Sequence, residues 1–349
     1  MTGMPSLLEI NDLHVSFKTH GGEVKALRGV NLTLNEGETL AIVGESGSGK
    51  SVMARSIMRL IPERSGRIIR GSIRYKGREL TALSEKEMRK LRGAEISIIF
   101  QDAMTALNPV ISVGEQIMEG ILRHRKVSRQ EARREAVEIL GLVGIPNPEI
   151  RLKQHIHQLS GGMRQRIMIA IAVACKPSIL IADEPTTALD VSIQAQIIRL
   201  FKELQQKTGV SILFITHDLG VVAKMADRVG VMYAGRIVES GSVQDIFYHP
   251  QHPYTKGLLA SMPRIDADRK VPLQPIPGTP PDLYAPPPGC AFALRCKYAM
   301  EVCGTIAPKE TLIHPDHTVS CWLQDPRAKP IKELVDKRAS EPRFLISSK

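Results

Sequence analysis

The amino-acid sequence predicts an α/β fold that carries a phosphate-binding loop, and three observations support this fold class. Short apolar runs alternate with segments of helical periodicity along most of the 349 residues. A glycine-rich stretch connects one apolar run, Thr39–Val43, to a helix-like segment that begins near Lys50. A second apolar run, Ile179–Ala182, ends in the acidic pair Asp183 and Glu184. The length indicates about two domains.

Residues 44–51 read G-x-x-x-x-G-K-S between the expected strand and helix. Glycines let the backbone N–H groups point inward, and the helix N-terminus adds the positive end of its dipole. Lys50 can then reach the β- and γ-phosphates, and the Ser51 hydroxyl can bind Mg²⁺. Such a pattern also arises by chance, but its flanking strand and helix favour a nucleotide site. The candidate nucleotide-binding residues are Gly44, Glu45, Ser46, Gly47, Ser48, Gly49, Lys50 and Ser51.

The remaining elements follow from periodicity and from turn and capping signals. Capping boxes at Ser84 and Ser128 predict two helix starts. A helical insert is expected at about 102–158, before the strand–helix alternation resumes. Strands are predicted at 6–17, 30–34, 73–75, 96–100, 179–182 and 211–215, a hairpin at 231–238, and helices from about 163 and near 193–207.

The charge and the apolar runs limit the possible functional classes. The formal net charge of +11 suits nucleic acid or an anionic membrane surface, but the basic residues are dispersed. No signal segment is visible at the N-terminus. The longest apolar run, Ile167–Cys175, is far shorter than the roughly 18 residues that a membrane span needs. We therefore expect a cytosolic chain that meets membranes only through partners.

The acidic pair has a chemical interpretation. An aspartate at the end of a strand beside a phosphate loop suits Mg²⁺ coordination, and Asp183 has this position. Glu184 is then free to act as a general base on the attacking water. The alternative is that the pair simply opens the next loop, Pro185–Thr187.

Residues 159–163 read Leu-Ser-Gly-Gly-Met, where Ser160 is a candidate helix N-cap. The stretch resembles the Leu-Ser-Gly-Gly-Gln signature of ATP-binding cassette (ABC) ATPases, with Met163 in place of glutamine. Gln101, Asp190 and His217 match the same superfamily in order and spacing. The resemblance covers about residues 6–260. It implies a P-loop NTPase core of ABC type with an antiparallel β subdomain and an inserted α-helical subdomain at about 102–165.

The resemblance also implies that two cassettes pair head to tail, with each ATP between the phosphate loop of one and the signature of the other. The implied catalytic residues are Glu184, His217 and Gln101, and the implied Mg²⁺ ligands are Ser51, Gln101 and Asp183. Ser160, Gly161, Gly162 and Met163 would contact the partner's nucleotide, Asp190 would lie at the dimer seam, and Phe17 would stack on adenine.

Three stretches narrow the resemblance to the ATP-binding subunits of oligopeptide and dipeptide permeases: Phe100–Pro109, Ala182–Val191 and His252–Thr255. This likeness implies a peripheral ATPase on the cytoplasmic face of the cell membrane. Its expected partners are a second, paralogous cassette subunit, two transmembrane permease subunits and an extracellular or periplasmic solute-binding protein. No nucleic acid is expected.

Two other functions remain open. An importer of nickel or another small solute has the same motifs, and a soluble ABC ATPase of nucleic acid or ribosomes fits the basic charge. The sequence contains one cassette and no DNA-binding insert, which argues against the second. Cargo selectivity is expected to reside in other subunits.

Beyond about residue 250 the composition changes to a proline-rich, extended tether followed by four cysteines. Cys290, Cys296, Cys303 and Cys321 have the spacing C-x5-C-x6-C-x17-C, which lacks the short pairs typical of structural zinc. Four thiolates suit a [4Fe–4S] cluster, and some of the permease relatives carry one here. Zinc and free thiols remain alternatives. Arg295 and Lys297 are expected to lower the pKa values of the thiols.

The predicted organisation is thus an ABC-type nucleotide-binding domain at 1–260, a Pro-rich and Cys-bearing C-terminal domain at 261–325, and a tail at 326–349.

Overall fold

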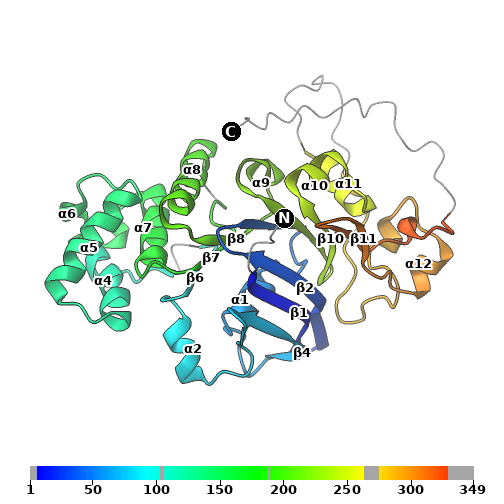
Figure 1. Ribbon diagram of the computed structural model, residues 1–349, viewed down its shortest axis with the longest axis horizontal. Coiled ribbons are helices and arrows are strands. Elements are labelled where there is room, and N and C mark those ends of the chain that lie inside the picture. Colours follow the sequence, from blue (N-terminus) through cyan, green and yellow to red (C-terminus); the bar gives the residue numbers. More distant parts are fainter. Residues whose placement is uncertain (1–5, 103–105, 188, 263–274, 329–349) are drawn as a thin grey trace.

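The computed structural model describes residues 6–102, 106–187, 189–262 and 275–328. An eight-stranded sheet and a four-stranded sheet form its framework. The helices α4 to α7 gather at one end of the molecule, and the C-terminal segment with α12 lies at the other (Figure 1). Within the described ranges, no helix combines the length and the apolar character that a membrane span requires.

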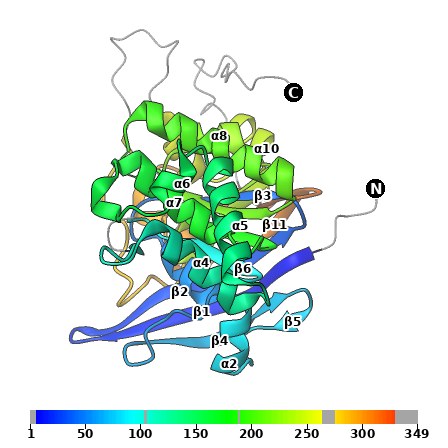
Figure 2. The same ribbon diagram turned by 90° about the vertical axis from the view of Figure 1, so that its left-hand side faces the viewer.

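The large sheet has the strand order β11-β12-β10-β9-β3-β8-β7-β6. Its strands are β3 (Thr39–Val43), β6 (Ile96–Ile99), β7 (Ile179–Asp183), β8 (Ser211–Thr216), β9 (Arg228–Tyr233), β10 (Arg236–Ser242), β11 (Thr311–His314) and β12 (His317–Val319). The small antiparallel sheet has the order β2-β1-β4-β5. Its strands are β1 (Ser6–Thr19), β2 (Gly22–Asn35), β4 (Gly66–Tyr75) and β5 (Arg78–Glu79). In Figure 2 the small sheet lies below the large sheet, and α8 and α10 lie above the large sheet.

The helices cover the large sheet and build the insert. They are α1 (Lys50–Ile57), α2 (Glu85–Leu91), α4 (Val113–His124), α5 (Arg129–Leu142), α6 (Pro148–Arg151), α7 (Gly161–Val173), α8 (Val191–Thr208), α9 (Leu219–Met225), α10 (Val243–Tyr248), α11 (Pro253–Ala260) and α12 (Glu301–Thr305). Short 3₁₀ turns lie at Ile156–Gln158, Ala293–Arg295 and Trp322–Gln324. The capping boxes expected at Ser84 and Ser128 are confirmed, since in each the serine and the third helical residue bond reciprocally.

Strands β3, β7 and β8 form the centre of the fold. Every residue of these three strands is buried, as expected for parallel strands that are covered on both faces. They pair in parallel, with Val43 beside Thr216 and Asp183 beside Ile215. Their carboxyl ends therefore meet at one edge of the sheet, which is where ligands bind in folds of this type.

The C-terminal segment extends the large sheet instead of hanging free from it. β12 pairs with β10, with Glu239 opposite Val319, and so adds the hairpin β11–β12 to the core sheet. The proline-rich stretch also contacts the cassette, because the Lys25 N–H donates to the Leu283 carbonyl at 2.9 Å. Residues 275–288 contain no helix or strand and pack against the cassette. Residues 263–274 and the tail from 329 lie outside the described residues. The division at residue 260 stays a prediction.

The β9–β10 turn supports the phosphate loop. The Gly235 N–H donates to the Ser48 carbonyl, and its carbonyl accepts from the Arg28 N–H, both at 2.8 Å. Gly235 has φ +77°, and a Cβ at this position would lie 2.6 Å from the Ala26 carbonyl oxygen. The backbone carbonyl leaves no room for a side chain, so the turn requires glycine.

We expect Gly235→Ala to destabilise the protein much more than the control Gly77→Ala. Gly77 has nearly the same backbone angle, φ +74°, but a Cβ there would meet nothing within 4 Å. The control should lower the free energy of unfolding by about 1–2 kcal/mol, because alanine disfavours the left-handed backbone. Gly235→Ala should lower it by roughly 1–3 kcal/mol more, because the Cβ displaces the neighbouring backbone. Denaturant unfolding of both variants measures this difference. Equal losses would show that the steric contact does not matter.

Candidate nucleotide-binding site

The loop between β3 and α1 has the shape that its glycines permit. Gly44 has φ +156°, and a Cβ on it would lie 2.1 Å from the Met232 carbonyl oxygen, so only glycine fits. Gly47 and Gly49 have φ +76° and +108°. The buried Ser48 hydroxyl has no hydrogen-bond partner among the described residues. The loop thus combines a tight backbone turn with an unpaired polar group at the start of a helix.

Lys50 folds back over this loop. Its Nζ donates to the carbonyl oxygens of Gly44 at 2.8 Å and Glu45 at 3.0 Å. Burial lowers the pKa of Lys50, although the carboxylates of Glu184, Asp183 and Glu45 oppose the change. A buried ammonium that is held by loop carbonyls is well placed to exchange them for phosphate oxygens.

The expected magnesium ligands on the loop and on β7 lie together. The Ser51 hydroxyl donates to Asp183 Oδ1 at 2.9 Å, across 132 residues of sequence. Asp183 is buried, and burial together with the neighbouring Glu184 raises its pKa. A bound divalent cation would stabilise the ionised carboxylate, so these oxygens fit a Mg²⁺ ion.

Glu184 is the point where three segments meet. Its Oε2 accepts from Gln101 Nε2 at 3.1 Å and from the Thr187 hydroxyl at 3.0 Å, and it lies 3.4 Å from His217 Nδ1. Glu184 itself has φ +49°, a left-handed backbone that is uncommon outside glycine and often occurs at functional sites. The structure therefore brings Gln101, Glu184 and His217 together, as the resemblance implied.

The signature residues occupy the start of α7, and each lies outside the group around Glu184. Ser160 is the N-cap of α7, where its hydroxyl accepts from the Met163 N–H at 3.4 Å. A Cβ on Gly161 would meet nothing within 4 Å, whereas Gly162 lies against Ile193. This helix end is thus open on the side of Ser160 and Gly161.

Asp190 and Phe17 have contacts that the sequence did not indicate. Asp190 caps α8, because its Oδ1 accepts from the Ile193 N–H at 2.9 Å. The Phe17 ring is partly buried and lies beside Gly66, where an added Cβ would come 2.6 Å from it. The dimer and adenine roles of these two residues stay predictions.

Arg295 is the main site residue that sequence analysis missed. It comes from the cysteine-bearing segment, yet its guanidinium binds the Glu45 carboxylate with two hydrogen bonds, of 2.7 and 2.9 Å. The arginine side chain is 4% exposed and the glutamate 27%. Arg295 also donates to the Tyr233 hydroxyl and the Pro277 carbonyl. The partners are 250 residues apart in sequence, and no local pattern could have paired them.

Other C-terminal residues lie over the same loop. The Glu45 N–H donates to the Tyr254 hydroxyl at 2.8 Å. A small hollow has loop residues 45–48 on one side and Pro280, Pro281 and Leu283 on the other. The Tyr284 hydroxyl lies 3.0 Å from that of Thr19, at the turn between β1 and β2. The C-terminal segment is therefore part of the surroundings of the phosphate loop.

The four C-terminal cysteines converge, although their sequence spacing is irregular. Burial raises the pKa of Cys321 to about 12, and the other three thiols contribute to the increase. Burial also raises the pKa values of Cys290 and Cys296, so the expected net lowering is wrong. Lys297 does lower the pKa of Cys296, but burial outweighs this effect, and the Arg295 guanidinium is paired with Glu45.

The strand-end carboxylates beside the phosphate loop define a P-loop nucleotide-binding protein. Residues 27–187 match the family model described as ABC transporter. Residues 238–303 match the one described as oligopeptide/dipeptide transporter, C-terminal region.

Curated relatives align along almost their full length. The dipeptide transport ATP-binding protein DppD of Bacillus subtilis is 60% identical over 93% of this chain and 97% of the relative. The oligopeptide transport ATP-binding protein OppD of the same organism is 58% identical over 95% of this chain and 93% of the relative. A bacterial ABC transporter cassette solved as a dimer has a TM-score of 0.61 and 28% identity, over 68% of this chain and 99% of that one. The chain belongs to the ATP-binding proteins of the ABC transporter family.

We expect Arg295→Ala to weaken ATP binding about tenfold, or roughly 1.4 kcal/mol. The substitution leaves the Glu45 carboxylate unpaired beside the loop, where it would repel the triphosphate. The double variant Arg295→Ala with Glu45→Gln should regain most of the affinity, because it removes that charge. Titration with a fluorescent ATP analogue measures the ATP affinity of the single and the double variant.

The matched control is Arg327→Ala, which breaks an exposed arginine–carboxylate pair with Asp325 in the same segment. It should leave the ATP affinity unchanged. Wild-type affinity in Arg295→Ala would show that the ion pair has no influence on the nucleotide.

Proposed function

We propose that the chain binds and hydrolyses ATP to energise a membrane importer of dipeptides or oligopeptides. The observation that carries this proposal is the likeness to peptide-transport ATP-binding proteins over more than nine-tenths of the chain, including the C-terminal region. The site geometry supports the chemical part, because Ser51 of the phosphate loop bonds Asp183, and the next residue, Glu184, bonds Gln101.

Each residue of the site has a role in this proposal. The backbone of residues 44–49 and the Lys50 ammonium hold the phosphates. Ser51 and Asp183 hold Mg²⁺, with Gln101 near the metal and the attacking water. Glu184 accepts a proton from that water, while His217, 3.4 Å from Glu184, contacts the γ-phosphate. Bound Mg²⁺ supplies charge neutralisation for the phosphates.

The open end of α7 supports a second proposal, that the site is shared between two cassettes. Helix N-termini favour anions, and Ser160 and Gly161 present such an end away from the chain's own phosphate loop. In the proposed assembly Ser160, Gly161, Gly162 and Met163 contact the nucleotide of a second, paralogous cassette, and Asp190 lies at the seam. The relative solved as a dimer is a precedent for such pairing.

The remaining partners follow from the same relatives. We infer that the paired cassettes attach to two transmembrane permease subunits at the cytoplasmic face of the membrane, and that a separate solute-binding protein delivers the peptide. The segment after Gln101 connects β6 to the helical insert, so a change at the γ-phosphate would reach that insert through Gln101. Adenine stacking on Phe17 belongs to the same proposal.

Glu184→Gln should retain ATP binding and lose about 100-fold or more of the hydrolysis rate, because an amide cannot accept the proton. The control Glu203→Gln changes an exposed glutamate on α8 that pairs only weakly with Lys207. ATP binding and phosphate release by the assembled complex measure the two properties separately. Wild-type turnover by Glu184→Gln would rule out the assignment of the general base.

The cysteine group forms the last part of the proposal, a [4Fe–4S] cluster held by Cys290, Cys296, Cys303 and Cys321. All four sulfurs are close enough to influence one another electrostatically. A single zinc ion with bonds of about 2.3 Å needs sulfurs within about 4.6 Å of one another. Among the described residues no three cysteine sulfurs lie within 4.8 Å. This wider spacing fits a cluster better than one ion.

Anaerobically purified protein should therefore contain roughly four iron atoms per chain and absorb near 400 nm. Cys303→Ser should lose this iron. The control Cys175→Ser should keep it, because Cys175 lies in the cassette and bonds the Gly120 carbonyl. Iron-free wild-type protein would exclude the cluster.

A further inference from the structure

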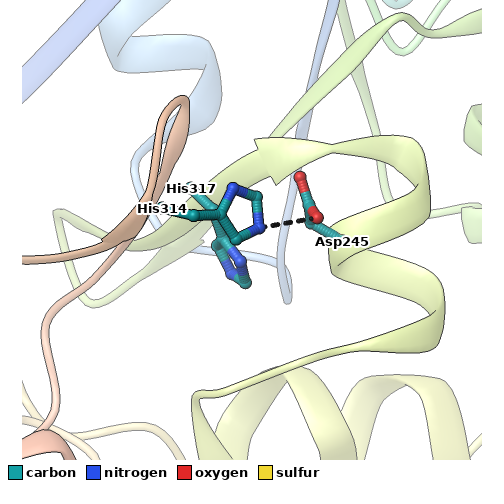
Figure 3. A group of neighbouring side chains, drawn as sticks. All are labelled: Asp245, His314 and His317. Atoms are coloured by element: carbon teal, nitrogen blue, oxygen red, sulfur yellow. Dashed lines mark hydrogen bonds and ion pairs between the residues drawn. The ribbon is translucent and has the colours of Figure 1, made fainter.

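Two histidines and an aspartate gather where the C-terminal hairpin meets the cassette (Figure 3). Asp245 is the third residue of α10, His314 ends β11 and His317 begins β12. One potential ligand atom from each lies within 4.8 Å of the other two. None of these residues belongs to the nucleotide site or to the cysteine group.

The hydrogen bonds of His314 determine which of its nitrogens is protonated. Its Nδ1 lies 3.0 Å from the Pro315 carbonyl oxygen, which can only accept, so Nδ1 carries the hydrogen. Its Nε2 lies 3.0 Å from Asp245 Oδ1, which as a carboxylate is also only an acceptor. Both ring nitrogens of His314 therefore face an oxygen acceptor, and a metal ion beside Nε2 and Asp245 Oδ1 could bind both atoms.

His317 also places a ring nitrogen beside a carboxylate oxygen, in a fully buried position. Its Nε2 lies 3.0 Å from Glu239 Oε1, so this nitrogen donates its hydrogen to the carboxylate. The His317 side chain is 1% exposed, and its Nδ1 has no hydrogen-bond partner among the described residues. Glu239 is held in place, because it also accepts the N–H groups of Gln251 and His252.

An imidazole that donates one N–H to a fixed oxygen and keeps the other nitrogen free is the usual arrangement around protein-bound zinc. Both histidines have an outer oxygen, Pro315 or Glu239. The second nitrogen is without a hydrogen-bond partner among the described residues in His317 and faces Asp245 in His314. The Asp245 carboxylate is fixed as well, since its Oδ2 accepts the N–H and the hydroxyl of Ser242. Histidine nitrogen and carboxylate oxygen are ligands that zinc prefers.

We propose that Asp245, His314 and His317 form a binding site for one divalent transition-metal ion of the zinc type, in which all three side chains bind the metal. Three protein ligands leave a fourth position for water. Because the ligands come from α10 and from the β11–β12 hairpin, the ion fastens the C-terminal segment to the cassette. The site is separate from the four cysteines and contains no thiolate.

Cobalt(II) distinguishes this site from the cysteines, because thiolate ligands give an intense charge-transfer absorption that histidine and carboxylate ligands lack. Full-length protein with its cysteine group loaded should bind one Co²⁺ per chain without that absorption. Added Zn²⁺ should displace the Co²⁺.

His314→Ala should reduce the affinity for Co²⁺ at least tenfold, and its side chain is 48% exposed, so the variant is expected to fold. The control is His249→Ala, which removes an exposed histidine just after α10 and should leave the affinity unchanged. Metal should also raise the melting temperature of the wild type and of His249→Ala, but not of His314→Ala.

Three results would overturn the proposal. Wild-type protein could bind no Co²⁺ beyond its thiols, in which case the contact between His314 and Asp245 is only a hydrogen bond. His314→Ala could bind Co²⁺ as tightly as the wild type. His249→Ala could lose binding to the same extent, which would indicate nonspecific surface histidines.

Discussion

The register of three buried parallel strands is the constraint on which the site depends. β8 lies between β3 and β7 and pairs with both, so that Val43, Thr216 and Asp183 end at the same edge of the sheet. Because all residues of these strands are buried on both faces, a one-residue shift in register would exchange the side chains packed on the two faces and disrupt both contacts. The hydrogen bond between Ser51 and Asp183 joins residues 132 positions apart, and it follows from this register. Chemistry at the site is therefore a consequence of core packing.

The C-terminal segment adds a second level of support around the loop. Arg295 binds the Glu45 side chain, Tyr254 accepts the Glu45 N–H, and the β9–β10 turn holds Ser48 through Gly235. The strand β12 fixes the same segment to β10. The environment of the cysteines and the shape of the phosphate loop are thus parts of one packed structure. A change at the cysteines could reach the nucleotide through Arg295, which lies next to Cys296 in the sequence.

Local signals in the sequence predicted most of the cassette. The capping boxes at Ser84 and Ser128 fixed two helix starts, and apolar runs followed by Gly44 or Asp183 located the strand ends. Contacts over long separations could not be predicted from such signals. Nothing around Arg295 indicates Glu45, and the short strands β11 and β12 lack the alternation that identifies longer ones. Similarly, Asp190 was singled out for a dimer contact, whereas its visible interaction is the cap of α8.

The central claim is that one copy of the chain contains half of each of two ATP sites. One half is the phosphate loop, the other is the open N-terminus of α7, and a second cassette completes both. Ser160→Arg tests it directly, because Ser160 is exposed and the change does not touch the chain's own loop. ATP binding by the isolated variant and ATP turnover by the assembled importer should be measured together. The account predicts wild-type ATP affinity in the isolated variant and loss of most turnover in the importer. It would be contradicted if the isolated wild-type chain hydrolysed ATP as fast as the importer, and Ser160→Arg left the importer's turnover intact.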